Sequence, residues 1–531
     1  MTAGTATIPH QPDVGRGPGT LENSPRPGRR LWAHVVRRCL LVPFLVLAPL
    51  AAVAPRGDQR FNLYWHGGLF RDDPLRIITH TIATTETYLR LGNFRPLGRM
   101  TEKALDLLVY IGMQQLHLPA TVLLRLVTLG AAIAVTFAVV LLAESVLTRG
   151  RMFTTAPSVV ALLLPYAVGA GFVAAGRNST TTLFGGLYLS TTALVLLVAV
   201  AACRLARMRW WHAVFAVTAG GALAVYNEPA YFAVPLATAA VLLRNRFVLG
   251  QGARELLRSP GVRFAALLWA GFLPVFGTVR WVIRGYCADG GCYHGSDMVV
   301  DPDSLLVLPV RMLAWTPPMS WPAATERAGA SWPWGILPVV ALLVLAVLAL
   351  RTLKISPEAD RPAGRALAGL ALTALVLLTF GALPAALSVE IHTYYPGPAL
   401  WQQGWRDSAV TAPAGMLLVA TLLAFAARTG RRSAGLVLAV LVLAATGTVA
   451  ANRAYADAAA GWEASQLDNR IALALGAFER GRAGDARRCA LLDEALRSQQ
   501  DQPSKQQRYT DSLNTAAEDL AGVPFCRGNT P

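Results

Sequence analysis

Charged residues are scarce in this chain of 531 residues, at 15% against about a quarter in an ordinary soluble protein. Lysine is almost absent, with only Lys103, Lys354 and Lys505. Hydrophobic residues make up 54% of the chain, and they gather in blocks of roughly 17–25, the length that crosses a bilayer as a helix. Because unpaired backbone groups are not tolerated in lipid, such spans must be helical. The sequence therefore predicts an all-α, polytopic membrane protein.

Acidic residues are also few, which leaves a net charge of +17 carried almost entirely by arginine. Much of this arginine lies in short loops between apolar blocks, where membrane topology accounts for it. We therefore do not interpret the charge as a nucleic-acid surface. The partner that the composition predicts is the lipid bilayer.

We expect about eleven spans, at residues 35–55, 119–146, 155–175, 185–203, 211–226, 229–243, 263–283, 335–351, 366–388, 410–427 and 434–451. Arginine clusters precede the first span and follow the second and every later even-numbered span, and the ones after the tenth are Arg428, Arg431 and Arg432. All of these clusters fall on the side of the N-terminus. The positive-inside rule makes that side cytoplasmic and predicts a multi-pass protein of the plasma membrane.

Three regions follow from this topology. Residues 1–30, rich in Pro, Gly and Thr, are expected to be a disordered cytoplasmic tail. Residues 31–451 form the transmembrane domain, with a retained first span and a long extracytoplasmic loop at 56–118. Residues 452–531 have helical patterns broken at Pro503 and are expected to be a small extracytoplasmic helical tail.

Cysteine is rare, and the six cysteines are Cys39, Cys203, Cys287, Cys292, Cys489 and Cys526. Cys287 and Cys292 share one external loop, and Cys489 and Cys526 share the external tail. Two pairs on the oxidising side predict two disulfides. The alternative is that Cys287 and Cys292 bind a metal ion together with His294, but a single Cys-x4-Cys with one histidine is a weak zinc pattern.

The first external loop is long, and ordered connections of that length are usually functional. It contains "FRDDPLRIITH" at 70–80, in which Asp72 and Asp73 are adjacent carboxylates near the membrane, followed by Glu86. We take Asp72 and Asp73 as candidate catalytic groups and Glu86 as a candidate binding group. Asp73 also precedes Pro74, so it could instead be a helix cap.

The same loop contains "NFRPLGR", where Arg95 and Arg99 could converge on an anion because guanidinium groups match phosphate geometry. The alternative is that both side chains extend to lipid headgroups. Glu228 in "YNEPAYF" interrupts an apolar stretch, and an intramembrane carboxylate is costly without a partner or water. It is either a binding group or the solvated residue of a hairpin turn.

The segment "EIHTYYPGPALWQQGWRD" at 390–407 contains His392, Tyr394 and Trp401 among other aromatic and polar residues. Such rings stack on sugar faces, and they also fill the aromatic belt at a membrane interface. We take these three as candidate substrate-binding residues. No group of residues has the spacing of a metal site.

The arrangement resembles the GT-C superfamily of polytopic membrane glycosyltransferases, and "RDDP" and "NFRPLGR" are similar to the acidic and arginine-proline segments in the first external loops of such enzymes. The resemblance implies a polyprenyl-phosphate-linked sugar donor, a glycan or lipid acceptor, and transfer on the outer face. In that case Asp72 or Asp73 would be the general base. Arg95 and Arg99 would hold the phosphate, and Glu228 and His392 would line the same site. Such a site could work without a metal ion, or the acidic pair could hold a divalent cation.

Two other functions fit the same sequence. A transporter or flippase of lipid-linked intermediates usually places its polar residues at the bilayer midplane and shows internal repeats, whereas the polar clusters here lie at the outer ends of the spans and no repeat is evident. A non-catalytic scaffold subunit would use the helical tail to recruit a partner. An enzyme predicts one shared cavity for Asp72, Arg95, Glu228 and His392, whereas a scaffold predicts that they scatter.

Overall fold

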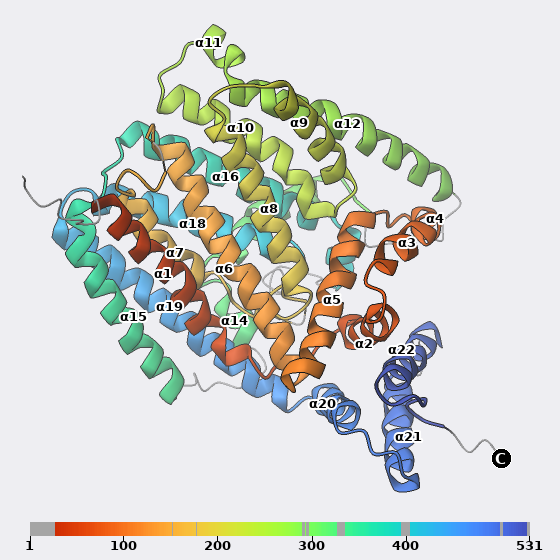
Figure 1. Ribbon diagram of the computed structural model, residues 1–531. Helices are drawn as coiled ribbons and strands as arrows, with labels where there is room; N and C mark the ends of the chain where they lie inside the picture. The colour runs from red at the N-terminus through yellow and green to blue at the C-terminus, as the bar shows by residue number, and fades with distance from the viewer. Residues whose placement is uncertain are drawn as a thin grey trace, which may run out of the picture.

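The computed structural model describes residues 27–150, 152–176, 178–288, 292–293, 297–325, 335–394, 404–499 and 503–527. Within these ranges the chain folds into α-helices and short 3-10 helices, and it forms no β-strand there. Most of the helices pack into one bundle, and a smaller group of helices covers one end of it (Figure 1).

Eight helical segments of the described chain are long and apolar enough to cross a membrane, the first of them α1 extended by the short helix η1 (Ala48–Leu50). Their helices are α1 (Pro27–Leu47), α6 (Ala120–Leu147), α8 (Gly185–Arg204), α12 (Pro260–Tyr286), α15 (Ile336–Ile355), α16 (Gly364–Leu387), α18 (Ser408–Ala427) and α19 (Arg431–Ala460). The protein is therefore a multi-pass helical membrane protein, as the composition predicts.

Each of the eleven expected spans falls on a helix, but three of these helices are short. They are α7 (Val159–Ala170), α9 (Trp210–Ala224) and α10 (Ala233–Phe247), with 12, 15 and 15 residues. A helix of 15 residues rises about 22 Å, less than the roughly 30 Å of a hydrocarbon core. Polar and helix-breaking residues between α9 and α10, including Asn227 and Pro229, end the helices early. Eight helical segments of the described chain thus have the length of a full membrane crossing, and α7, α9 and α10 do not.

The remaining helices lie between the spans and at the C-terminal end. They are α2 (Gln59–Phe70), α3 (Arg76–Ala83), α4 (Thr85–Arg90), α5 (Pro96–Leu116), α11 (Ala253–Arg258), α13 (Pro302–Ala314), α14 (Trp321–Thr325), α17 (Val389–Tyr394), α20 (Glu463–Gly476), α21 (Arg482–Arg497) and α22 (Pro503–Ala521), with the 3-10 helices η2 (Glu228–Phe232) and η4 (Ser356–Glu358).

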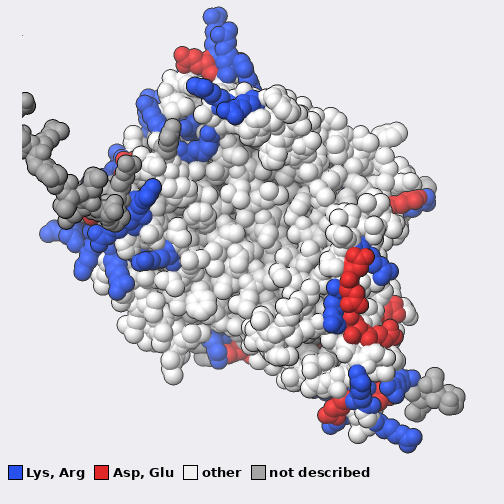
Figure 2. Space-filling model, in the orientation of Figure 1, with Lys and Arg blue, Asp and Glu red and all other residues white. Residues whose placement is uncertain are grey.

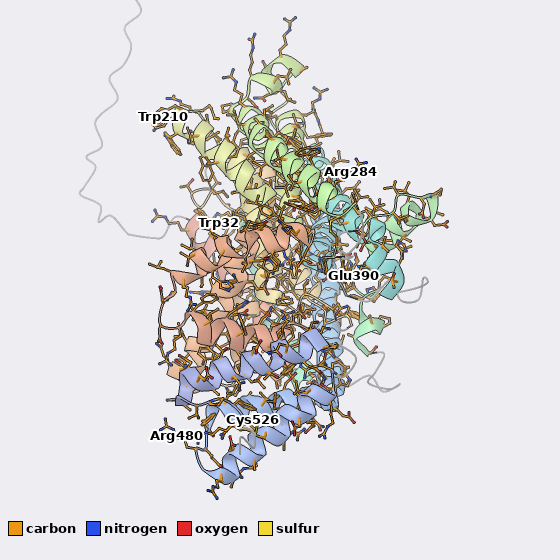
Figure 3. The ribbon with its side chains drawn as sticks, turned by 90° about the vertical axis from the view of Figure 1, so that its right-hand side faces the viewer. Trp32, Trp210, Arg284, Glu390, Arg480 and Cys526 are labelled. Carbon is orange, nitrogen blue, oxygen red and sulfur yellow. A yellow bond between two sulfur atoms is a disulfide. The ribbon has the colours of Figure 1, made fainter. Side chains whose placement is uncertain are left out.

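The long loop at 56–118 and the C-terminal tail form one body at the same end of the bundle, which we call the loop end. Phe61 and Tyr110 from the loop share a hydrophobic cluster with Leu513 and Phe525 from the tail. The ion pair between Arg60 and Asp468, at 2.6 Å, joins the two across this cluster. Figure 3 shows the tail, with Arg480 and Cys526, at the opposite end of the molecule from Trp210 at the start of α9.

Charge separates along the bundle in a way that fits a membrane. Figure 2 shows a broad uncharged band between two charged ends. Lys and Arg gather at the end that holds the start of α1 and α11, whereas Asp and Glu gather mainly over the loop end. The positive-inside rule expects such a difference in Lys and Arg between the two ends of a membrane protein.

A buried arginine fixes the chain beneath the loop end. Arg125 on α6 is 7% exposed and has five hydrogen bonds to backbone carbonyl oxygens. Two go to Val53, one to Ala54, and one each to Thr181 and Thr182. These bonds satisfy carbonyl groups that would otherwise be left unpaired where the chain is irregular. They hold the segment after η1 and the segment before α8 together.

The contact between α9 and α12 depends on glycine. A Cβ atom on Gly271 would collide with the carbonyl oxygen of Val217 on α9. Small residues let helices approach this closely in membranes. We expect Gly271→Val to push the two helices apart and to destabilise the protein by about 1–3 kcal/mol, the usual range for overpacking.

The measurement is the midpoint of heat-induced loss of the monomer peak in size-exclusion chromatography in detergent. Gly277→Val is the matched control, because Gly277 lies on the same helix with nothing within 4 Å of the added Cβ. Equal midpoints for the two variants would show that the close contact contributes nothing to stability.

Candidate functional site

A cavity of about 970 Å³ lies at the loop end, between α2, α4, α5, the segment before α8, and α22. We call it the polar cavity. Its walls include the charged residues Arg95, Arg99, Glu102, Lys103, Glu390 and Arg406, and the rings of Trp65, Tyr88, Tyr188 and Trp405. The tail contributes Lys505, Arg508 and Asp511 from α22. The C-terminal tail is therefore part of the cavity wall.

α5 and its N-cap residue Arg95 supply four of the charged residues, including Arg99 and Glu102. Pro96 is the first residue of this helix. Proline is favoured there because an N–H in the first turn has no acceptor within the helix, so its absence costs no hydrogen bond. Gly98 lets the helix start approach the chain after α9, since its N–H donates to the carbonyl oxygen of Tyr226 at 3.0 Å and a Cβ there would collide with that oxygen. Residues three and four apart on a helix share a face, so Arg95, Arg99 and Glu102 all reach the cavity.

Two arginines and two glutamates form a loose cluster beside this face. Arg95 lies 3.6 Å from Glu228, and Arg406 lies 4.0 Å from Glu228 and 3.9 Å from Glu390. These distances are too long for hydrogen bonds. Burial alone would raise the pKa of Glu228, but Arg95 and Arg406 hold it below its ordinary value. Glu228 therefore stays ionised.

Several buried polar atoms in this cluster have no hydrogen-bond partner in the described chain. They are Nε and Nη1 of Arg95, Nε of Arg99, Oε2 of Glu228 and Oε2 of Glu390. Native proteins rarely leave buried polar groups unpaired, and such groups call for an explanation. Arg99 also stacks 3.3 Å from the centre of the Tyr88 ring. Burial, followed by repulsion from Arg95, lowers the pKa of Arg99. An anion between the two guanidinium groups would relieve this repulsion.

A second cavity, of about 400 Å³, adjoins the first. We call it the apolar cavity, because most of its wall surface is apolar, from residues such as Tyr231, Phe232, Phe276, Met298, Pro384 and Val410. The charged residues that also line it are Glu228, Arg280, Asp297, Arg406 and Asp407. Trp405 and Arg406 line both cavities. Glu228 lines the apolar cavity while it pairs with Arg95 of the polar one. With Arg99 beside it, the cluster has three arginines against two glutamates, and this cationic boundary stands between a polar space and an apolar space.

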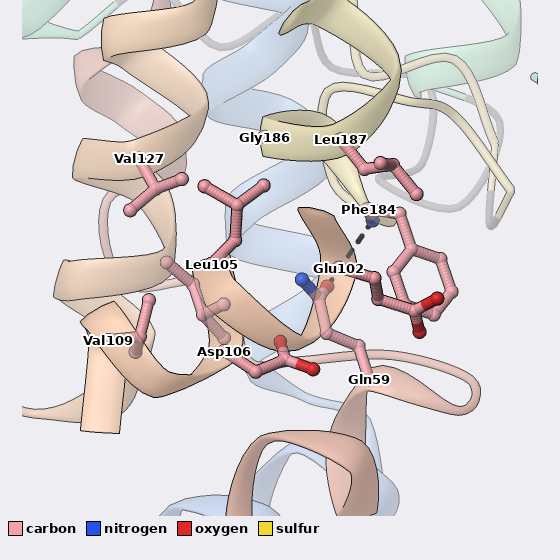
Figure 4. Close-up of a pocket in the computed structure, with 10 residues that line it drawn as sticks. Gln59, Glu102, Leu105, Asp106, Val109, Val127, Phe184, Gly186 and Leu187 are labelled. Carbon is pink, nitrogen blue, oxygen red and sulfur yellow. Dashed lines mark hydrogen bonds between the residues drawn. The ribbon is translucent and has the colours of Figure 1, made fainter. Parts of the chain in front are cut away.

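Two histidines on the wall of the polar cavity have partners on α5. Nδ1 of His66 lies 2.7 Å from a carboxylate oxygen of Asp106, and Nδ1 of His80 lies 3.0 Å from Nζ of Lys103. Burial, followed by Arg99, lowers the pKa of Lys103 to about 8. Burial raises the pKa of Asp106 to about 6, although its hydrogen bond with His66 opposes the rise. Figure 4 shows Asp106 and Glu102 on the same helix beside Gln59.

The acidic pair predicted to be catalytic lies outside this arrangement. Asp72 and Asp73 are exposed, and neither lines the polar or the apolar cavity. Oδ1 of Asp73 accepts a hydrogen bond from the backbone N–H of Leu75 at 3.1 Å, so this side chain caps the turn before α3. Glu86 is also exposed and pairs with Arg90 one helical turn later, at 2.6 Å. The positions of these residues give no support to a catalytic or binding role.

The other predicted binding residues divide. Arg95 and Arg99 line the polar cavity, and Glu228 lines the apolar one. His392 lines neither, and its Nε2 lies 2.9 Å from the carbonyl oxygen of Ala386. Tyr394 ends α17, but its side chain is outside the described part of the structure, and so is Trp401.

Both predicted disulfides are present, Cys287–Cys292 and Cys489–Cys526. Cys39 and Cys203 are buried and unpaired, as expected. The first disulfide packs against Gly92 in the turn between α4 and α5, and the N–H of Tyr293 donates to the carbonyl oxygen of Leu91 at 2.9 Å. The second joins α21 to the end of the tail.

Sequence reasoning missed several residues that the fold brings to the polar cavity or places behind its wall. His66, Lys103, Asp106 and Tyr293 received no role, and Glu390 and Arg406 were only part of an aromatic segment. Arg406 donates to the hydroxyl of Tyr293 across the cavity. A signal did exist in the spacing of Arg95, Arg99, Glu102 and Asp106, which repeats every three to four residues as on one helix face.

No metal site is evident in the part of the chain that the structure describes, since it has no group of three or more His, Cys, Asp or Glu able to hold an ion. The candidate site is therefore a polar cavity with a cationic rim that opens on an apolar one. Comparison with models of protein families, with curated proteins and with solved structures finds no match to this chain.

Proposed function

We propose that the protein is an integral membrane glycosyltransferase of the GT-C type, which transfers a sugar from a polyprenyl-phosphate donor to an envelope glycan or a lipid. The observation that carries this proposal is the pair of adjoining cavities that share Trp405 and Arg406. A polyprenyl-phosphate sugar has an apolar chain, an anionic group and a polar head in that order. The cavities offer an apolar space, a cationic boundary and a polar space in the same order.

The cationic boundary would hold the phosphate. Arg95 and Arg406 are only loosely paired with Glu228 and Glu390, and Arg95 has buried donor atoms without hydrogen-bond partners. A phosphate would supply those acceptors. Guanidinium groups bind phosphate in a bidentate manner, and in a site that excludes water they would stabilise the charge that develops on the leaving phosphate.

The polar cavity would hold the sugar and its acceptor. Rings of Trp65, Tyr88, Tyr188 and Trp405 line it together with carboxylates and arginines. Aromatic faces with polar neighbours suit sugars, which have apolar faces and hydroxyl edges. Its volume of about 970 Å³ is at the upper end of the range for pockets that bind small molecules, which leaves room for two substrates.

The cysteines support an extracytoplasmic site. Both disulfides lie at or near the loop end, and disulfides persist in oxidising compartments. The arginine-rich end of Figure 2 lies opposite, where the positive-inside rule expects the cytoplasm. We therefore propose that transfer takes place on the outer face of the plasma membrane.

Donor binding can be tested on the purified protein in lipid nanodiscs. We expect farnesyl phosphate to raise the thermal midpoint in a dose-dependent way, and farnesol and inorganic phosphate to raise it much less. Binding of farnesol alone would argue for a site that recognises lipid without phosphate. No response to any of the three would remove the donor from the proposal.

Transfer itself can be tested in cells. Deletion of the gene should remove one sugar from an envelope glycan or glycolipid, as seen by mass spectrometry, and wild-type protein should restore it. A flippase would be favoured instead if the deletion made an unchanged lipid-linked sugar accumulate on one leaflet and the purified protein transferred no sugar. An unchanged glycan profile would favour a scaffold role.

A further inference from the structure

We propose that His66, oriented by Asp106, is the general base that deprotonates the acceptor hydroxyl. This inference rests on the proposed function and names the group that would activate the acceptor. Neither residue stands in the acidic pair Asp72 and Asp73 that the sequence suggests for this task.

The two side chains form a buried dyad. Nδ1 of His66 on α2 lies 2.7 Å from Oδ2 of Asp106 on α5, and the two side chains are 12% and 4% exposed. A carboxylate on one ring nitrogen places the proton there and leaves the other nitrogen, Nε2, unprotonated. The dyad thus holds an imidazole in the form that can accept a proton.

The positions of His66 and Asp106 relative to the polar cavity indicate the role of each residue. His66 lines the polar cavity, whereas Asp106 lies behind it in a small space among Gln59, Leu105 and Val109 (Figure 4). A substrate in the polar cavity would reach the imidazole and not the carboxylate. His66 is therefore the catalytic candidate, and Asp106 is a positioning residue.

The spacing of residues along α5 leaves room for a sugar between the cationic boundary and His66. Arg99 and Asp106 lie seven residues apart on α5, which corresponds to a rise of about 10 Å along the helix axis. A hexose is shorter than this, so a phosphate held by Arg99 and Arg95 leaves room for the sugar and for an acceptor oxygen beside His66. Glu102, between them on the same face, accepts a hydrogen bond from Asn62 at 2.9 Å.

The step is a single displacement at the anomeric carbon. The acceptor oxygen forms a bond to this carbon, while the bond from the carbon to the phosphate oxygen breaks and its electron pair leaves with the polyprenyl phosphate. The hydroxyl proton goes to Nε2 of His66, and Asp106 stabilises the imidazolium. The proton then passes to water. No metal or redox partner is needed to balance this step.

Other titratable groups near the dyad will contribute to any pH profile. The charged and titratable groups that line the polar cavity together with His66 are Asp58, His80, Tyr88, Arg95, Arg99, Glu102, Lys103, Tyr188, Tyr293, Glu390, Arg406, Lys505, Arg508 and Asp511. The ring of Phe70 stacks on His66 and carries no charge. The transfer rate should fall at low pH, where the dyad is protonated. If a variant of the dyad no longer shows this decrease, the dyad is its cause.

The test compares His66→Gln and Asp106→Asn with wild type in a purified transfer assay. We expect kcat to fall about 10²–10⁴-fold in His66→Gln, with the response to farnesyl phosphate unchanged. The fall of the rate at low pH should disappear in His66→Gln and move in Asp106→Asn. Asp457→Asn is the control, because Asp457 is exposed and pairs with Arg453 on the surface of α19.

Retained binding of farnesyl phosphate also shows that the variants are folded. Near-normal transfer by His66→Gln would overturn the proposal, and so would an unchanged pH profile in both variants. Loss of transfer in Asp72→Asn or Asp73→Asn, with His66→Gln active, would return the base to the acidic pair. A wild-type protein without transfer activity would reject the proposed function itself, and the base with it.

Discussion

Replacement of Asp407 by alanine should destabilise the folded protein by about 3–5 kcal/mol, the cost of leaving one partner of a buried ion pair without the other. Nη2 of Arg311 lies 2.7 Å and 2.8 Å from the two oxygens of Asp407, and the two side chains are 0% and 1% exposed. Trp315 donates a third hydrogen bond to this carboxylate at 3.3 Å. Without Asp407, the Arg311 guanidinium would lose this buried ion pair.

The effect is measured as the shift in the thermal midpoint in detergent, together with the fraction of protein that elutes as a monomer. Asp457→Ala is the matched control, because it breaks an Arg–Asp pair in which both side chains are about half exposed. Pairs of that kind contribute about 0.3–0.5 kcal/mol. Similar midpoints for Asp407→Ala and Asp457→Ala would mean that water reaches Arg311.

A double replacement distinguishes the effect of the charges of Arg311 and Asp407 from the effect of their packing. Arg311→Met combined with Asp407→Leu removes both charges while keeping apolar volume, and buried pairs replaced in this way are often neutral or more stable. We expect the double variant to recover most of the midpoint lost in Asp407→Ala. A double variant as unstable as Asp407→Ala would point to lost hydrogen bonds with neighbours, not to the loss of the ion pair.

The bundle was predictable because its signal is local. Blocks of apolar residues and the arginines that follow them specify helices and sides of a membrane without knowledge of the fold, and all eleven expected ranges fall on helices. The sequence pattern does not separate full spans from the shorter helices α7, α9 and α10, because an apolar block has the same composition whether lipid or other helices surround it. α7 is buried along its whole length, so neighbouring helices and not lipid surround it.

The candidate site was only partly predictable, because it joins segments far apart in the chain. Arg95 and Glu228 were each singled out, but their contact depends on the start of α5 meeting the end of α9. Arg406 meets Tyr293 through a loop that the Cys287–Cys292 disulfide holds. Asp72 and Asp73 looked functional because two adjacent carboxylates near a membrane are unusual. They lie in the exposed turn between α2 and α3. A short separation from the first span along the sequence does not determine whether a residue lines the cavity.

Arg406 is the residue on which the proposed donor site depends most. It lines both cavities, lies within 4.0 Å of Glu228 and Glu390, and donates to the hydroxyl of Tyr293. Removal of one preorganised group that stabilises developing charge costs about 10²–10³ in kcat. We expect Arg406→Gln to lose this much transfer activity and to weaken the thermal response to farnesyl phosphate.

The lysine variant makes the same prediction more specific. Lysine keeps the positive charge but lacks the planar fork that binds two phosphate oxygens at once, so Arg406→Lys should recover part of the binding and little of the rate. Arg453→Gln is the control for loss of a surface arginine, because the side chain of Arg453 is 48% exposed and lies near the C-terminal end of α19. If Arg406→Lys restored the rate fully, charge alone would be required at the boundary. If Arg406→Gln bound farnesyl phosphate as wild type does, the anion would lie elsewhere, and the adjoining cavities would no longer identify the donor.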